Sequence, residues 1–304
     1  MNSSRFTFSF SSTLVISLAL SAATILCACD SVDPSGTASA DLSSGNPPDT
    51  SRTGAQNPPI SSTPATGTPT STGSRNYTTA VLLFNGAGVS TSDWQSTEQI
   101  VKSQGLSYTL ANSAQLDAMS LDQLISYGTI IVPGGAGGTI ANGVSPATRI
   151  RLRQAVRDHG VGYVGFCAGA WVAVGPEAMA DKTAFYGFAI APGNVLSLFL
   201  PGGQSPTAAM VPASFPDGTS RSLVWWGGPS TPEWKNGVIA RYDTGEAAIS
   251  ETFSGKGLVV ISGPHPEAPQ GWRATAGKDS DGLDYDIAIK MIHAAIDQVP
   301  LSTF

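Results

Sequence analysis

The chain has 304 residues, only 12% of them charged, and a formal net charge of −6 at pH 7. No basic patch with interleaved aromatic residues is visible, so nucleic acid is not an expected partner. The three histidines are scattered, and neither His159 nor His293 has a companion at metal-ligand spacing. We therefore expect no metal site and no cofactor, in a chain long enough for one large domain or two small ones.

The first 29 residues have the features of an export signal. An apolar run from Leu14 to Leu26 is too short to span a membrane as a mature helix but suits the core of a signal peptide. The run ends in L-C-A-C, which resembles a bacterial lipoprotein box whose last cysteine, here Cys29, is lipidated. We expect residues 1–29 to be removed up to that cysteine, leaving the protein lipid-anchored in the cell envelope or periplasm. Ordinary cleavage and full secretion is the alternative.

Residues 30–76 differ sharply in composition from the rest of the chain. They are rich in Ser, Thr, Pro, Gly, Ala and Asn, with almost no large apolar side chain to offset the entropy cost of ordering. This composition predicts a disordered tether between the anchor and a folded domain at 77–304. If Cys29 is acylated and the leader removed, Cys167 is the one thiol left, and reactivity explains a lone exported thiol better than packing does.

Alternating strands and helices are predicted for the first half of the domain. Ser145 fits a helix cap, Pro146 the first helical position and Gly160 the residue just past the helix end. The predicted strands are 79–84, 106–111, 129–132 and 161–166, and the predicted helices are 92–104, 113–127 with a break near Ser120, 146–159 and 168–174. Such repetition predicts right-handed crossovers and a mostly parallel sheet with helices on both faces.

The second half is read mainly as strands. They are expected at 183–190, 207–212, 223–226, 237–242, 247–252 and 258–261, before a last helix at 283–298. The fold class is therefore α/β, with additional strands in the C-terminal half.

Cys167 stands between two glycine-containing runs, Y-V-G-F before it and A-G-A-W after it. A strand that ends in a nucleophile and turns directly into a helix is the layout of a nucleophile elbow, here with Cys in place of Ser. Neighbours without a Cβ avoid collisions at such a strained turn, and the helix N-terminus favours a thiolate. A buried structural cysteine in a glycine-rich core strand is the alternative.

Two further motifs follow predicted strands, where the working groups of parallel sheets gather. Asn85-Gly86 follows the first strand and Gly134-Gly135 the third. The last strand leads into G-P-H-P-E, in which His265 and Glu267 are two residues apart. A thiol nucleophile needs a base to accept its proton and a third group to orient the base. Cys167, His265 and Glu267 are candidates for those three roles.

These motifs carry a resemblance to the class I glutamine amidotransferase-like superfamily. V-P-G-G, G-F-C-A-G-A and G-P-H-P-E occur in order, and F-N-G-A-G-V-S with W-W-G-G-P resembles landmarks of the N-terminal domain of biotin-protein ligases, which also occurs alone in bacterial proteins. The resemblance covers nearly all of residues 79–298. It implies a flavodoxin-like sheet, the triad above, and an oxyanion hole from the N–H groups of Gly135 and Ala168. Neither a biotinyl-adenylate loop nor an ammonia-accepting synthase is recognisable, so biotinylation is not predicted.

Two functions are compatible with these residues. The first is an exported cysteine hydrolase or amidase that acts on an amide or related acyl substrate through a thioester. The second is a catalytically silent ligand-binding or scaffold module of the cell envelope, with an unidentified protein partner. Under either function, the pocket candidates are Gly134, Asn85, Gly86, Trp225, Trp226, Gly227 and Gly228.

Overall fold

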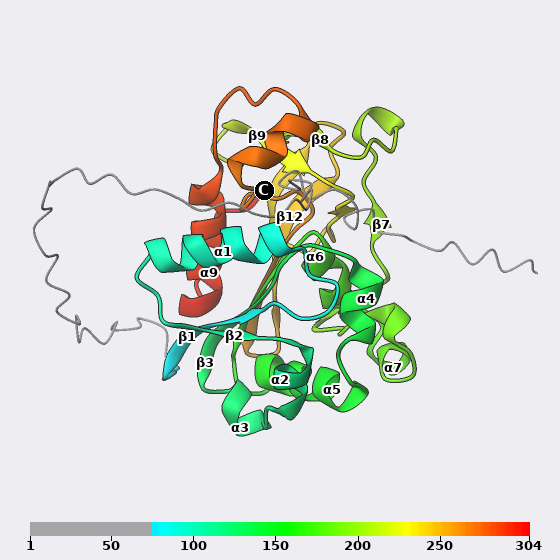
Figure 1. The fold of residues 1–304 in the computed structure, drawn as a ribbon. Coiled ribbons are helices and arrows are strands. Elements are labelled where there is room, and N and C mark those ends of the chain that lie inside the picture. The colour runs from blue at the N-terminus through cyan, green and yellow to red at the C-terminus, as the bar shows by residue number, and fades with distance from the viewer. Residues whose placement is uncertain (1–74) are drawn as a thin grey trace, which may run out of the picture.

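The computed structural model describes residues 75–304 (Figure 1). The predicted signal peptide, the lipidation candidate Cys29 and nearly all of the predicted tether lie outside these residues. Within residues 75–304, no helix is long and apolar enough to cross a membrane.

A nine-stranded mixed sheet forms the centre of the domain, in the order β2-β1-β3-β4-β13-β12-β11-β8-β9. The first five strands in this order, from β2 to β13, are parallel to one another. From the pairing of β13 with β12 onward, each strand is antiparallel to the one before it. The strands are β1 (Thr79–Phe84), β2 (Tyr108–Ala111), β3 (Tyr127–Val132), β4 (Gly162–Phe166), β8 (Ala209–Ser214), β9 (Ser220–Trp225), β11 (Val238–Tyr242), β12 (Ala247–Ser254) and β13 (Gly257–Ser262). The predicted α/β class with a large central sheet is confirmed, and the additional C-terminal strands extend that same sheet.

Two short strand pairs lie outside the central sheet. One is parallel and the other antiparallel: β5 (Val174–Gly175) with β6 (Ala191–Pro192), and β7 (Ser197–Leu198) with β10 (Pro229–Ser230).

Helices connect the parallel strands, and a helix is also the last element of the chain (Figure 1). They are α1 (Thr91–Ser103), α2 (Ser113–Ala118), α3 (Leu121–Leu124), α4 (Gly137–Asn142), α5 (Pro146–Arg157), α6 (Ala168–Ala173), α7 (Glu177–Ala180), α8 (Arg273–Ala276) and α9 (Tyr285–Asp297), with the 3-10 turns η1 (Ala184–Tyr186), η2 (Pro201–Gly203) and η3 (Gln270–Trp272). The predicted start of α5 is confirmed, because Ser145 Oγ accepts the N–H of Thr148 and Pro146 is the first helical residue.

Neighbouring residues of the parallel strands belong to two separate hydrophobic clusters. Leu83 and Val164 lie in a cluster with apolar residues of α1 and α9, whereas Leu82 and Tyr163 lie in a cluster with residues of α5. Consecutive side chains of a strand point to opposite faces of the sheet, so continuous apolar runs are required where both faces are buried. The apolar composition of these strands therefore follows from their central position.

The structure differs from the sequence-based expectation at several segments. The predicted strand at 183–190 is wrong: it is replaced by η1, because Gly187 and Ala189 have positive φ angles of 65° and 51°, which no strand accommodates. The helix predicted over 113–127 is two helices, separated where predicted by the Ser120 cap of α3. A helix that was not predicted, α4, follows the Gly134-Gly135 turn.

Candidate active site

Cys167 forms a sharp turn between β4 and α6. Its backbone has φ 46° and ψ −101°, a region that residues with a Cβ rarely occupy. Its N–H donates to the carbonyl of Ser262 at 2.8 Å, at the end of the adjacent parallel strand β13. The carbonyl of Cys167 in turn accepts the N–H of Trp171 at 3.1 Å. The strained residue is therefore held from both sides by regular structure, as expected where strain persists at a functional site.

Glycines around the turn allow the two elements to approach closely. A Cβ on Gly169 would lie 1.8 Å from the carbonyl oxygen of Val132, and one on Gly165 would lie 2.6 Å from backbone atoms of Gly169. These are backbone collisions, which no rotamer change relieves. The glycines flanking Cys167 in sequence are thus required by the packing of α6 against β3 and β4.

His265 follows β13 and is held by two carboxylates. Its Nδ1 lies 2.7 Å from Oε1 of Glu267 and 3.3 Å from Oδ2 of Asp93, and all three side chains have no exposed surface. Oδ2 of Asp93 also accepts the backbone N–H of Gly134 at 3.0 Å. Because both carboxylates face Nδ1, the neutral imidazole carries its proton there, which leaves Nε2 as the basic nitrogen.

Gly134 ties the histidine to the cysteine. A Cβ built on Gly134 would lie 2.6 Å from Cε1 of His265 and 3.4 Å from Cβ of Cys167. Both side chains therefore border the same small space, and only a glycine at position 134 leaves that space open. The structure thus brings together four residues from the ends of β3, β4 and β13 and from α1.

Burial shapes the electrostatics of this cluster. Burial first, and then the charge of Asp93, raise the pKa of Glu267 to about 8, against the opposing effect of His265. Oδ1 of Asp93 and Oε2 of Glu267 are both buried without a hydrogen-bond donor among the described residues. The buried environment therefore favours the protonated form of the Glu267 carboxyl near neutral pH.

The loop after β9 borders Cys167. The thiol Sγ lies 3.5 Å from the carbonyl oxygen of Trp226, and the carbonyl of Gly227 accepts the indole N–H of Trp171 at 3.4 Å. The Trp226 ring contacts Trp272 of η3 edge to face, with ring centroids 5.2 Å apart, and Trp272 contacts His265 in the same manner at 5.0 Å. The ring of Trp272 therefore packs against His265, and the backbone of Trp226 borders the thiol of Cys167.

The other predicted residues occupy different places. Trp225 is buried in the core cluster of α1 and α9 and donates its indole N–H to the carbonyl of Gly228. Gly228 itself packs against Gly263, where a Cβ would lie 1.9 Å from the carbonyl oxygen. Gly86 packs against Ser113 of α2, and the Oδ1 atom of its neighbour Asn85 is buried without a hydrogen bond from the described residues.

Of the two proposed oxyanion donors, Ala168 is next to Cys167 in the chain, and Gly135 follows Gly134, which borders Cys167 in space. Ala168 is the first residue of α6, directly after Cys167. Gly135 follows Gly134 with a φ of 148°, and its turn is fixed by a hydrogen bond from the N–H of Ala136 to the carbonyl of Gly88 at 2.7 Å. A Cβ on Gly135 would lie 2.0 Å from that same carbonyl oxygen, which excludes any larger residue.

Among residues 75–304, one group has the donor atoms and spacing that could hold a metal ion. It is the set Asp93, His265 and Glu267, whose candidate ligand atoms lie within 4.8 Å of one another. The hydrogen bonds of this set to one another and to Gly134 already account for that proximity.

Asp93 is the site residue that sequence reasoning missed. It lies in the first turn of α1, where an acidic residue ordinarily stabilises the positive end of the helix dipole at the surface. Its complete burial shows that it serves an internal contact instead. Its position just after the F-N-G-A-G-V-S motif was the available signal, because the carboxyl ends of neighbouring parallel strands converge.

Comparisons with known proteins give structural neighbours only. No known family model matches the sequence, and no curated protein does. The structure is similar to a glutamine amidotransferase, with 18% identity, a TM-score of 0.48, and coverage of 72% of this chain and 100% of that one. It is also similar to a cytoplasmic protein from Salmonella typhimurium, with 12% identity, a TM-score of 0.47, and coverage of 71% and 98%. A glutamine amidotransferase from Methylobacillus flagellatus has 14% identity, a TM-score of 0.42, and coverage of 74% and 93%.

Proposed function

We propose that this protein is a cysteine-dependent hydrolase or amidase that acts on an amide or related acyl substrate. Cys167 is the nucleophile, His265 the base and Glu267 the residue that orients the base. The observation that carries the proposal is the strained backbone of Cys167 beside a buried imidazole that is hydrogen-bonded to a carboxylate. This combination supplies a nucleophile, a base and an orienting group in one place.

The reaction follows from these roles. The Cys167 thiol gives its proton to Nε2 of His265 as Sγ forms a bond with the carbonyl carbon of the substrate. The N–H groups of Gly135 and Ala168 stabilise the resulting oxyanion. The imidazolium then protonates the leaving amine as the C–N bond breaks, which leaves a thioester on Cys167. Water, deprotonated by His265, hydrolyses this thioester and regenerates the thiol.

The buried carboxylates support the charged intermediate of this reaction. An imidazolium beside Glu267 and Asp93 is stabilised by both, because each lies within 3.3 Å of Nδ1. This stabilisation favours transfer of the thiol proton to His265, and the resulting imidazolium next to the sulfur favours the thiolate.

The setting of this activity is also part of the proposal. Residues 77–304 form an amidotransferase-like domain, with an elaborated flavodoxin-type fold that has helices on both faces of the sheet, and it most resembles the N-terminal domain of biotin-protein ligases. Export through residues 1–29, a lipid anchor on Cys29 and the tether at 30–76 would hold this domain near a bacterial membrane. Biotinylation is not part of the proposed activity, and the substrate is a small molecule or another amide rather than nucleic acid.

The test measures how the rate of alkylation of Cys167 by iodoacetamide depends on pH. The midpoint of this dependence reports the pKa of the thiol even where burial slows alkylation, because limited access of the reagent lowers the rate by the same factor at every pH. We expect the midpoint of the native protein to lie below the ordinary thiol value of about 8.5, and to rise in His265→Ala and Glu267→Gln. His293→Ala, which alters an exposed histidine on α9, is the matched control and leaves the midpoint unchanged.

A panel of carboxamides assayed for release of ammonia or amine complements this measurement. Hydrolysis that disappears in Cys167→Ala supports the proposal. If the midpoint is the same in the native protein and in His265→Ala, the proposed base does not act on the thiol. The binding-module alternative would then describe the domain better.

A further inference from the structure

A cavity of about 300 Å³ lies beside the helix that follows Cys167. Its walls come from α4, from α6 and from the segment around η1. The lining includes the aromatic residues and glycines Gly137, Gly138, Trp171, Phe185, Tyr186 and Gly187. The volume is at the lower end of the range for small-molecule pockets in proteins.

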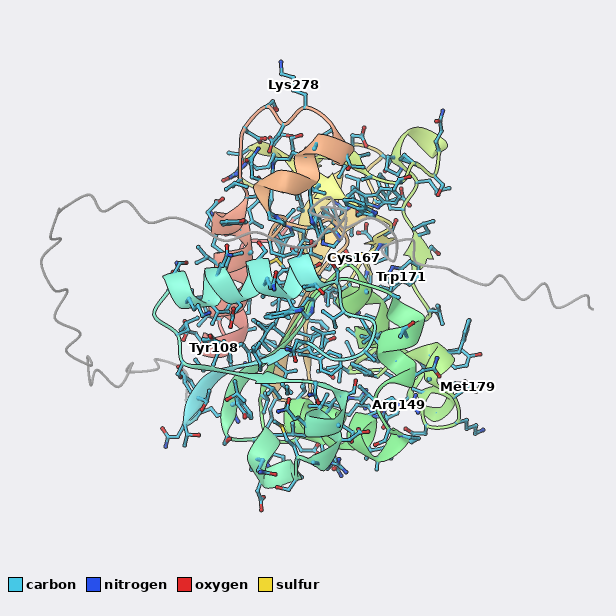
Figure 2. The ribbon with its side chains drawn as sticks, viewed as in Figure 1. Tyr108, Arg149, Cys167, Trp171, Met179 and Lys278 are labelled. Atoms are coloured by element: carbon cyan, nitrogen blue, oxygen red, sulfur yellow. The ribbon has the colours of Figure 1, made fainter. Side chains whose placement is uncertain are left out.

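The cavity adjoins the proposed catalytic centre. Trp171, one turn after Cys167 in α6, forms part of its wall, and Figure 2 shows both residues where α6 leaves the sheet. A Cβ on Gly137 would lie 3.6 Å from Cβ of Trp171 and 4.0 Å from Cβ of Ala168. Gly137, which lines the cavity, therefore packs against Trp171 and against Ala168, whose N–H is a proposed oxyanion donor. For an acyl substrate bound at Sγ, Trp171 is the lining residue nearest in the chain to the cysteine that carries the reacting carbon.

The lining is suited to a flat, apolar group. Phe185 is 60% exposed, which is unusual for such a side chain, and its ring meets that of Tyr186 at 88° with centroids 5.0 Å apart. The indole of Trp171 is fixed by its hydrogen bond to Gly227, so its ring face keeps one orientation. Rings held in this way gain from offset or edge contacts with another ring beyond the burial of area.

The absence of charged side chains from the lining favours an uncharged ligand. No Asp, Glu, Lys, Arg or His is among the lining residues, and the polar groups present are the amide of Asn142 and the hydroxyls of Thr183 and Tyr186. The amide nitrogen of Asn142 already donates to the carbonyl of Gly138 at 2.8 Å. A charged substituent would therefore lose its hydration without gaining a partner.

We propose that this cavity is the specificity pocket of the protein and binds an uncharged aromatic group on the acyl substrate. The assignment of this group to a substrate rests on the proposed function. The binding itself requires no catalysis, so the two can be tested separately.

The experiment uses the full chain with Cys167→Ala, and 1-naphthylacetamide as the ligand, with cyclohexylacetamide as its non-aromatic counterpart. Binding is measured by calorimetric titration. We expect saturable one-to-one binding of the naphthyl compound, at least tenfold tighter than that of the cyclohexyl compound. Adding Gly138→Leu fills the cavity and should weaken naphthyl binding at least tenfold. Adding Phe185→Ala should weaken it severalfold.

Phe253→Ala is the matched control, because Phe253 is also an exposed phenylalanine, at 47%, but lies on β12 away from this cavity. It should leave the affinity unchanged. A Cβ at Gly138 meets no atom within 4 Å, and Phe185 is largely exposed, so both variants should fold, as a melting curve will verify. If Gly138→Leu fails to fold, the comparison of Phe185→Ala with Phe253→Ala decides the question.

Several results would overturn the inference. They are the absence of saturable binding, equal affinity for the two compounds, or equal effects of Phe185→Ala and Phe253→Ala. If Cys167→Ala binds the naphthyl compound but the native protein hydrolyses no amide, the pocket stands and the proposed function fails. If the alkylation midpoint responds to His265→Ala but no binding occurs, the function stands and the pocket fails.

Discussion

Asp93 Oδ2 lies 3.3 Å from Nδ1 of His265 and at the same time accepts the N–H of Gly134. One buried carboxylate thus connects helix α1, the turn after β3 and the histidine after β13. The turn carries a proposed oxyanion donor, Gly135, and the histidine is the proposed base. Because Asp93 contacts both, a shift of the turn that carries Gly135 would also move His265, and the reverse.

Removing the charge of Asp93 should change how Glu267 titrates. The Asp93 carboxylate is one of the causes that raise the pKa of Glu267 to about 8, so Asp93→Asn should lower that pKa toward its ordinary value. The measurement is a pH titration of ¹³C-labelled glutamate carboxyls by NMR, with Glu267→Gln to assign the signal. An unchanged or higher midpoint in Asp93→Asn would contradict the assigned cause.

The strain at Cys167 predicts an unusual order of stability. At a φ of 46° an alanine retains the unfavourable Cβ contacts, whereas glycine does not. We expect Cys167→Gly to be more stable than Cys167→Ala by about 1 kcal/mol, although glycine normally destabilises a folded protein relative to alanine. Denaturant unfolding of the two variants measures this difference, and a less stable glycine variant would show that the turn is relaxed.

The close approach of α6 to β3 predicts a severe effect of a single methyl group. Gly169→Ala places a Cβ 1.8 Å from the carbonyl oxygen of Val132 and should cost more than about 3 kcal/mol or prevent folding. Gly138→Ala is the control, because its Cβ would meet nothing within 4 Å and alanine favours helix α4 by up to about 1 kcal/mol. Similar melting temperatures for the two variants would be inconsistent with the observed packing.

The stability of the fold should decrease as pH rises past 4.5, in part because of Glu251. Burial raises the pKa of this carboxyl from its ordinary 4.5 to about 7, although Oε1 accepts the N–H of Leu301. The folded state therefore binds the proton more tightly than the unfolded state. Its contribution is complete below about pH 4.5 and is lost as pH rises through about 7.

Glu251→Gln removes this titration but keeps an acceptor for Leu301. We expect the decrease in unfolding free energy between pH 4.5 and pH 8 to be smaller in the variant by about 1–3 kcal/mol. Asp284, whose pKa burial also raises to about 7, titrates in both proteins and does not affect the difference. Parallel curves for the two proteins would indicate that Glu251 titrates normally.

Local sequence patterns predicted much of the secondary structure, because strands, helix caps and helix breaks are determined largely by residues close to them in the chain. The apolar strands, the Ser145 cap with Pro146, and the break at Ser120 all depend on residues close in sequence. The segment 183–190 shows the limit of this approach. Its apolar residues fit a buried strand, but positive φ angles at Gly187 and Ala189 are set by the contact of this segment with Val172 of α6.

The candidate site divides in the same way. A cysteine between glycines and a histidine two residues before a glutamate are local signals, and they could be named from the sequence. Asp93 gave a weaker signal, because a single aspartate in the first turn of a helix is ordinarily a surface residue and only its position after the F-N-G-A-G-V-S motif pointed to the site. Trp225 and Trp226 are adjacent and therefore point to opposite sides of the strand end, and only the packed structure distinguishes the core residue from the one beside Cys167.

The pairing of β4 with β13 also bears on when the site comes into existence. Cys167 is anchored by Ser262, and His265 enters only after the chain has passed through the whole antiparallel extension of the sheet. Contacts between such distant segments form late, because a long loop must close before they contribute. Until these contacts form, the thiol lacks the residues proposed as its base and its orienting carboxylate. The proposed triad therefore exists only once β13 has paired with β4, so the thiol acquires its proposed base late in folding.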